Sequence, residues 1–208
     1  MSRVMFRFMA VSAIILFVTV SSVDARSIPP LEGLEALRKG FSGISDFTAD
    51  ITQEKRLSLM KRNMTMTGKV RFRKPDQFFM EINPPYTSRM VLKDSVIELA
   101  GGPEGKQHNK IVLPPEQGLG RWFSKLATPV TSIPDGVLIQ ADISNSLYTL
   151  TITPQGKGQV KELSISFLVD GTIRRLIITE QNGDKAAMTF KNLRRNLGLS
   201  DREFQLDP

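Results

Sequence analysis

Few side chains in this sequence belong to the types that carry out chemistry in proteins. The chain has no cysteine and a single histidine, His108. Disulfides, thiolate nucleophiles, cysteine-bound metals and sites built on two histidine ligands are therefore excluded. His108 lies between Gln107 and Asn109 in a stretch that we interpret as a polar loop with a solvated histidine.

The remaining candidates for chemistry are a set of carboxylates and a glycine-rich stretch. Asp46, Asp50 and Glu54 recur every four residues, but they fall in a segment whose apolar residues alternate, so we expect them on the solvent side of a strand. Residues 101–105, Gly-Gly-Pro-Glu-Gly, lack the Lys-Ser/Thr pair of a phosphate-binding loop. The sequence predicts no catalytic residue, no metal site and no cofactor, and so favours a protein that is not an enzyme.

The apolar residues are more distinctive. The chain has 9 methionines, and Met64, Met66, Met80, Met90 and Met188 fall in alternating segments. Methionine is unbranched and polarisable, so it adapts to irregular partners such as acyl chains. These residues line either a lipid cavity or an ordinary core, and the pattern alone leaves both interpretations open.

Two kinds of element are needed to position these side chains. Apolar residues spaced by three and four over residues 31–44 predict a helix, and from Phe47 the period changes to two, which is typical of half-buried strands. Asp170-Gly171 and Asn182-Gly183 are typical of tight hairpin turns. The sequence therefore predicts a chain that is mainly β with short helices.

The helices are expected to cover the sheet. Residues 118–127 predict a second short amphipathic helix, which contains the one tryptophan of the chain, Trp122. A curled sheet of about ten strands encloses more space than its own side chains fill. The pattern therefore predicts one antiparallel sheet or barrel of about ten strands, over whose open end the helices could lie as a lid on an apolar interior.

The first 25 residues have the features of a cleaved secretory signal peptide. Arg3 and Arg7 precede an apolar run over residues 8–20, and small residues lead to a cleavage site after Ala25. That run is shorter than the roughly 20 residues that span a bilayer, although an uncleaved anchor is the alternative. We expect a periplasmic protein whose single domain covers residues 26–208. The formal charge of +7 indicates acidic partners, and export argues against nucleic acid.

Several segments, in the same order along the chain, resemble the periplasmic outer-membrane lipoprotein carrier (LolA) family. The similar stretches are Phe-Thr-Ala-Asp-Ile-Thr-Gln at 47–53, Gly-Lys-Val-Arg-Phe-Arg-Lys-Pro at 68–75, Tyr-Thr-Leu-Thr-Ile-Thr-Pro at 148–154, Asp-Gly-Thr-Ile at 170–173 and Phe-Gln-Leu-Asp-Pro at 204–208. Each stretch is weak evidence by itself, and together they make the resemblance specific.

The resemblance implies a single incomplete antiparallel β-barrel of about 10–11 strands, covered by a helical lid and enclosing an apolar cavity. It also implies a soluble carrier that shields the acyl chains of lipoproteins and shuttles them from the inner to the outer membrane. The implied partners are acylated lipoproteins or other lipids, an inner-membrane lipoprotein-releasing transporter, an outer-membrane acceptor and, transiently, the membrane surface. We expect a monomer that assists outer-membrane biogenesis as a lipid-binding chaperone. Two alternatives remain in the same fold, a lipid-sensing regulator or adaptor and a carrier of a different (glyco)lipid; an enzyme is the third.

The predicted site has two parts. In the family an arginine often precedes the proline of the Lys-Arg-Pro turn and helps to hold the lid closed; here Lys74 has that place, and Arg73 beside it is expected to face the other way. These two are the candidate residues for clasping the lid. The candidate acyl-contact residues, each with plain core packing as the alternative, are Phe47, Ile51, Met66, Val70, Phe72, Phe78, Met80, Ile82, Leu92, Trp122, Phe123, Leu126, Leu150 and Ile152.

Overall fold

The computed structural model describes residues 25–101, 107–113, 127–156 and 158–206. Within these residues the chain forms twelve strands, the α-helix α1 (Pro30–Ser42) and the short 3-10 helix η3 (Asp201–Phe204). No helix in this part of the chain is long and apolar enough to cross a membrane. The strands are β1 (Arg26–Ile28), β2 (Asp46–Leu57), β3 (Arg62–Arg73), β4 (Gln77–Ile82), β5 (Ser88–Lys93), β6 (Val96–Gly101), β7 (Gln107–Val112), β8 (Val137–Ser144), β9 (Leu147–Pro154), β10 (Val160–Leu168), β11 (Ile173–Glu180) and β12 (Lys185–Arg195).

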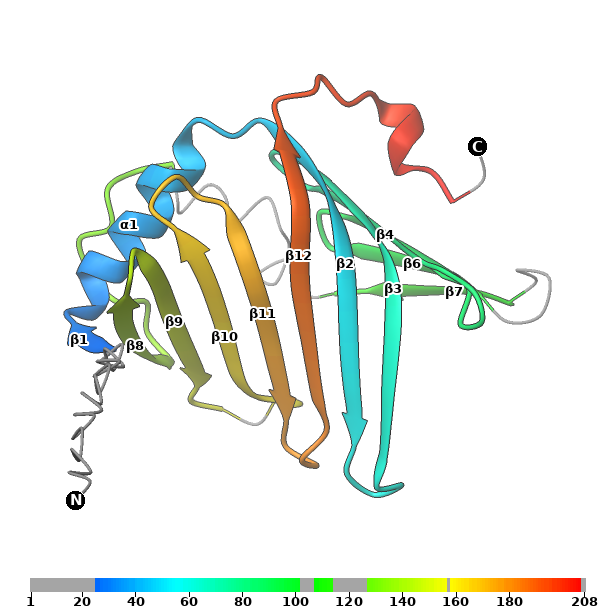
Figure 1. Ribbon diagram of the computed structural model, residues 1–208, viewed down its shortest axis with the longest axis horizontal. Coiled ribbons are helices and arrows are strands. Elements are labelled where there is room, and N and C mark those ends of the chain that lie inside the picture. Colours follow the sequence, from blue (N-terminus) through cyan, green and yellow to red (C-terminus); the bar gives the residue numbers. More distant parts are fainter. Residues whose placement is uncertain (1–24, 102–106, 114–126, 157, 207–208) are drawn as a thin grey trace, which may run out of the picture.

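All the strands join in one antiparallel sheet, in the order β1-β8-β9-β10-β11-β12-β2-β3-β4-β5-β6-β7 (Figure 1). The terminal strands β1 and β7 do not pair with each other, so the sheet is curled but not closed. This confirms the predicted incomplete antiparallel barrel, with twelve strands in place of about 10–11. The extra strand is β1, which is too short, at three residues, to show an alternating pattern.

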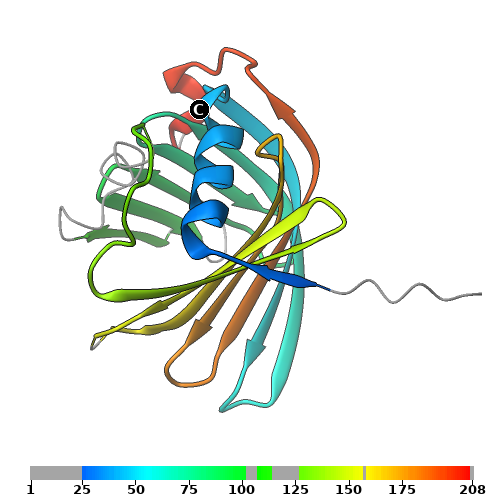
Figure 2. The ribbon, with the colours of Figure 1, turned by 90° about the vertical axis from the view of Figure 1, so that its left-hand side faces the viewer.

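Helix α1 lies inside the curve of the sheet (Figure 2). Pro30 opens the helix at a position where its missing N–H costs no hydrogen bond. Buried Gly33 lets the helix approach the sheet closely, because a Cβ there would lie 2.7 Å from both the Ala141 Cβ and a Leu150 methyl carbon. The side of the sheet that α1 contacts is called the inner face below, and the opposite side is the outer face.

The two glycine turns expected from the sequence join the strands as hairpins. Gly171 and Gly183 have φ angles of 80° and 86°, which glycine adopts without a steric penalty. The Asp170 and Asn182 side chains each accept a backbone N–H two residues further on. These local bonds connect β10 to β11 and β11 to β12, and so fix the register of three central strands.

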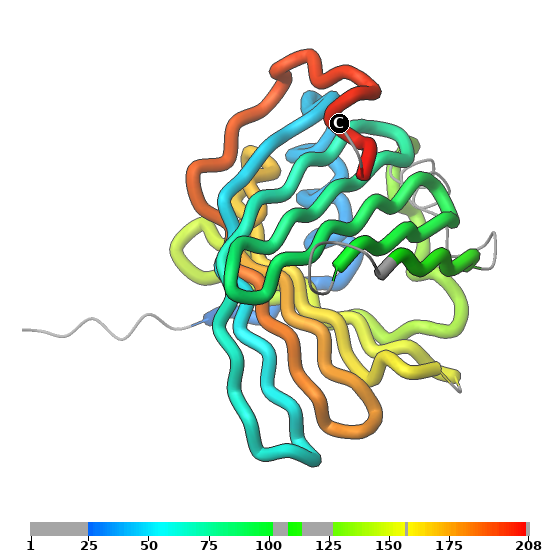
Figure 3. The backbone as a smooth tube through the Cα atoms, turned by 90° about the vertical axis from the view of Figure 1, so that its right-hand side faces the viewer, coloured from blue at the N-terminus to red at the C-terminus, as the bar shows by residue number. Residues whose placement is uncertain are grey.

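The C-terminal segment after β12 crosses the outer face (Figure 3). Phe204 of η3 packs there against Phe79 and Val91, with Leu199 and Leu206 beside them. This segment corrects the expectation that Asp46 is solvated. The Asp46 carboxylate is buried and accepts the backbone N–H groups of residues 197 and 198, because the chain end covers the face on which it lies.

His108 also differs from its expected setting. It lies on the edge strand β7, opposite Ala100 of β6, and not in a loop. Its side chain is exposed, as the sequence suggested. The sequence marks only the end of this strand, from Lys110 onward, because Gln107-His-Asn-Lys is polar throughout and shows no alternation of apolar residues.

Candidate functional site

The inner face of the sheet is a continuous apolar surface built from alternate residues of neighbouring strands. One row of paired residues runs Phe47, Phe72, Phe78, Leu92 and Ile97 across β2 to β6. Directly paired residues of antiparallel strands point to the same side of a sheet, so all residues of this row face the same space. Phe47 and Phe72 also touch through their rings, whose centroids are 5.2 Å apart.

The strand register places every described candidate for acyl contact on this face. They divide into two sets by exposure. The buried set is Phe47, Ile51, Val70, Phe72, Ile82 and Leu150. The half-buried set is Met66, Phe78, Met80, Leu92 and Ile152. Trp122, Phe123 and Leu126, with the helix predicted over residues 118–127, lie outside the described residues.

Helix α1 covers one half of the inner face. Leu34 of α1 packs with Ile139, Ala141, Leu150 and Phe167, all on strands β8 to β10. Beside this contact lies a pocket of about 330 Å³, with apolar walls from α1, β8, β9 and the segment that precedes β8. Its apolar lining residues are Leu34, Pro129, Val130, Pro134, Val137, Ile139 and Ile152.

The other half of the inner face, on β3 to β6, is rich in flexible side chains. Val70 of β3 pairs with Met80 of β4, which pairs with Met90 of β5, which pairs in turn with Leu99 of β6. The last three of these side chains are only half-buried. Unbranched methionines on a curved face are suited to contacts with flexible acyl chains. Met90 and Leu99 were missing from the predicted contact set, although the alternation in residues 88–101 would have included them.

Lys74 connects the sheet to the helix at the end of β3. Its Nζ donates to the carbonyl oxygen of Phe41 at 2.5 Å and lies 3.5 Å from that of Ser42. Both carbonyls belong to the last turn of α1, where the partial negative charge of the helix favours a cation. Burial lowers the pKa of Lys74 from its ordinary value. The lysine thus holds α1 in the curve of the sheet through a point charge on backbone carbonyls.

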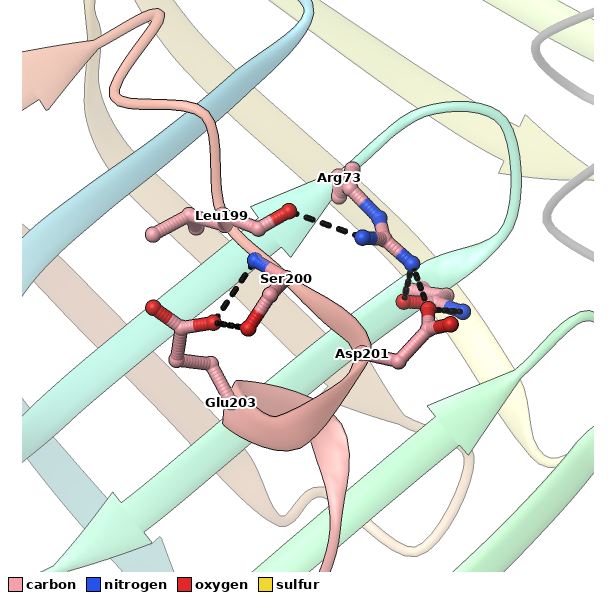
Figure 4. A network of polar contacts seen from close by, with 6 residues as sticks. Arg73, Leu199, Ser200, Asp201 and Glu203 are labelled. Carbon is pink, nitrogen blue, oxygen red and sulfur yellow. Dashed lines mark hydrogen bonds and ion pairs between the residues drawn. The ribbon is translucent and has the colours of Figure 1, made fainter.

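Arg73 points the other way, to the outer face, and binds the C-terminal segment (Figure 4). Its guanidinium donates to the carbonyl of Leu199 and the side-chain oxygen of Gln77, each at 2.7 Å, and forms an ion pair with Asp201. The hydrogen bond from Arg73 holds the pKa of Asp201 below its usual value. Two adjacent residues at the end of β3, the last of the strand and the first of the turn that follows, therefore fasten different elements on opposite faces: Lys74 binds α1, and Arg73 binds the C-terminal segment.

The described residues give no sign of a metal-binding cluster. No three His, Asp or Glu side chains among them come together as metal ligands would. The expected absence of catalytic residues and cofactors remains a prediction, because this observation covers only part of the chain.

Comparison with solved structures finds similar folds at low sequence identity. A LolA superfamily protein from Nitrosomonas europaea is 10% identical, with 86% of this chain and 99% of that chain covered and a TM-score of 0.45. An outer membrane lipoprotein-sorting protein domain from Vibrio parahaemolyticus, described as putative, is 11% identical over 85% and 96%, with a TM-score of 0.46. A chain in the complex structure of Pseudomonas aeruginosa MucA/MucB is 14% identical, with 84% of this chain and 60% of that chain covered and a TM-score of 0.46.

A match to a protein family covers most of the chain. No curated protein matches this sequence. The sequence pattern of a family described as "Outer membrane lipoprotein carrier protein LolA" matches residues 42–207, from the end of α1 to the end of the C-terminal segment. That range contains all strands of the sheet except β1 and most of the apolar inner face. The chain therefore belongs to the LolA family of outer membrane lipoprotein carrier proteins.

Proposed function

We propose that this protein is a periplasmic carrier that holds the acyl chains of lipoproteins against its inner face and shuttles them from the inner to the outer membrane. The observation that carries the proposal is the half-buried apolar surface on β3 to β6, where Met80, Met90 and Leu92 share the inner face. A folded core would be expected to bury such side chains more fully. Membership of a lipoprotein carrier family supports the same cargo.

Burial supplies the binding energy in this proposal. Each acyl CH₂ removed from water contributes about 0.8 kcal/mol, so a chain of ~16 carbons provides a strong driving force without any catalytic group. Release then needs a change in the cover of the inner face. Lys74 is our candidate for this control, because its bond to α1 holds the helix over the sheet.

Export is part of the proposal. The predicted leader ends at Ala25, directly before β1 begins at Arg26 and pairs with β8. We expect the purified periplasmic protein to begin at Arg26, as N-terminal sequencing or intact-mass measurement would show. A chain that still carries residues 1–25 would contradict cleavage and favour an uncleaved anchor.

The test of the carrier function is lipid transfer. The protein is loaded with an acylated lipoprotein bearing a label, and movement of the label to acceptor membranes is measured, with the non-acylated form of the same lipoprotein as control. We expect complexes with the acylated form only, and transfer that depends on the carrier. A stable complex with a protein partner and no net transfer would contradict the proposal and favour a regulator or adaptor.

A further inference from the structure

The hairpin between β2 and β3 ends in an unusually exposed apolar pair. Leu59 and Met60, in the turn, are 90% and 71% exposed, more than any other large hydrophobic residue among those described. A single exposed leucine is ordinary on a protein surface. Leu59 and Met60, adjacent at the end of a hairpin, form the first part of a binding surface. We call this surface the hairpin tip and define it as residues 55–62.

On the side of β4, the hairpin formed by β2 and β3 extends beyond the end of the neighbouring strand. Strands β2 and β3 pair as far as Leu57 with Arg62, whereas β4 pairs with β3 only from Gly68 onward. Six residues of β3 therefore continue past the end of β4, a length of about 20 Å at the usual rise of a strand. Figure 1 shows this hairpin reaching beyond its neighbours on that side, away from α1.

The hairpin tip is also held in position. On the other side, β12 pairs with β2 as far as Lys185 with Arg56. The turn itself is bonded to the next hairpin: the Ser58 N–H donates to the Asp184 carboxylate at 2.8 Å, and the Ser58 hydroxyl donates to the Gly183 carbonyl at 2.6 Å. The apolar pair is thus presented on an ordered support.

Cationic residues surround the apolar pair. Lys55 and Arg56 precede it, Lys61 and Arg62 follow it, and residues 55–62 contain no aspartate or glutamate. Apolar side chains flanked by lysine and arginine are suited to the boundary between lipid headgroups and acyl chains, where the cations meet phosphate groups. Two apolar side chains provide too little area for a stable protein interface.

We propose that the hairpin tip docks the protein on an anionic bilayer surface. Leu59 and Met60 insert between the headgroups, and Lys55, Arg56, Lys61 and Arg62 bind lipid phosphates. This assigns membrane contact to a particular segment at the end of the sheet remote from the α1 C-terminus. The inference does not depend on what the inner face binds, so it stands or falls separately from the carrier function.

The lack of native cysteine allows a site-specific test. Met60→Cys introduces a single thiol, which is labelled with an environment-sensitive fluorophore and mixed with phosphatidylglycerol–phosphatidylethanolamine vesicles. We expect a blue shift of the label with these vesicles and none with phosphatidylcholine vesicles. The matched control is Val169→Cys, at a 63% exposed position in the turn before β11, at the other end of the sheet. Equal shifts at both positions would overturn the proposal.

The contribution of the cations is tested by vesicle flotation. Replacing Lys61 and Arg62 by serine is expected to weaken binding to anionic vesicles on the order of tenfold. The charge-matched control replaces Lys191 and Arg194, two exposed cations of β12, by serine and should bind nearly as the parent does. Equal weakening by both pairs would show general charge attraction and refute the assigned surface, as would a parent protein that does not float with anionic vesicles. Acyl-chain binding, measured on the same samples, should not change.

Discussion

Lys74 is placed where one cation stabilises the end of a helix. Its Nζ bonds to the Phe41 carbonyl in the last turn of α1, and Lys74→Met removes that bond while keeping the apolar stem. We expect a loss of about 1–2 kcal/mol in the free energy of unfolding, because a charged donor to a helix end is lost from a half-buried position. Urea unfolding measures this loss. Lys69→Met, at an exposed position of β3, is the control, and equal stability of the two variants would contradict the assigned contact.

Glu35 provides a pH-dependent contact on α1. Two hydrogen bonds from Arg38, each 2.7 Å, are the main reason that the pKa of Glu35 falls from 4.5 to about 2. The backbone N–H of Val130 also points to this carboxylate, at 3.4 Å, which connects α1 to a wall of the pocket.

A carboxyl whose pKa is lowered by folding stabilises the native state above its unfolded pKa, and this contribution is lost on acidification. The stability of the parent should therefore fall more steeply than that of Glu35→Gln as the pH decreases from 4.5 to about 2. Denaturant midpoints measured across this range test the difference. Glu32→Gln, in the first turn of α1, controls for the loss of a carboxylate from the helix. Parallel pH curves for the parent and Glu35→Gln would count against the ion pair.

At the scale of elements, α1 is positioned by a close approach of two backbones. A Cβ on Gly40 of α1 would lie 2.5 Å from the backbone nitrogen of Gly171 in the turn between β10 and β11. Alanine is a better helix former than glycine by about 1 kcal/mol, but backbone atoms cannot move aside as a flexible side chain can. Gly40→Ala should therefore lower the free energy of unfolding by about 1–3 kcal/mol, as is typical of overpacking.

A second glycine of the same helix end provides the matched control. Gly43, at the C-cap of α1, has a φ of −85°, and a Cβ there would meet no atom within 4 Å. Gly43→Ala should unfold at nearly the same denaturant concentration as the parent. If Gly40→Ala proved as stable as Gly43→Ala, the position of α1 against this turn would be wrong.

At the scale of the whole molecule, the sheet was predictable because the sequence patterns that mark its strands and hairpins are local. Alternating residues and the Asp-Gly and Asn-Gly turns mark individual strands and hairpins without reference to the rest of the chain. The path of the C-terminal segment is not local. It covers the outer face through contacts such as Asp46 with residues 197 and 198, which are about 150 positions away in the chain and leave no periodic signal.

The same distinction applies to the candidate site. The side of the sheet on which each strand residue lies follows from odd or even position, so all described candidates share the inner face. Their burial depends on where α1 and the other strands pack, and this separates Val70, which is 0% exposed, from its half-buried partner Met80. Contact with an acyl chain remains a prediction for both.

That pair supplies a direct test of whether the inner face is a binding surface or only a core. Val70 and Met80 lie opposite each other on β3 and β4. Val70→Thr places a hydroxyl in a fully buried site and should reduce the free energy of unfolding by about 1–3 kcal/mol. Met80→Gln changes a half-buried side chain of similar length and should cost under about 1 kcal/mol, yet reduce binding of a fluorescent fatty acid several-fold. If Met80→Gln destabilised the protein as much as Val70→Thr and left fatty-acid binding intact, Met80 would be part of the core, and the surface on β3 to β6 would not be where the cargo binds.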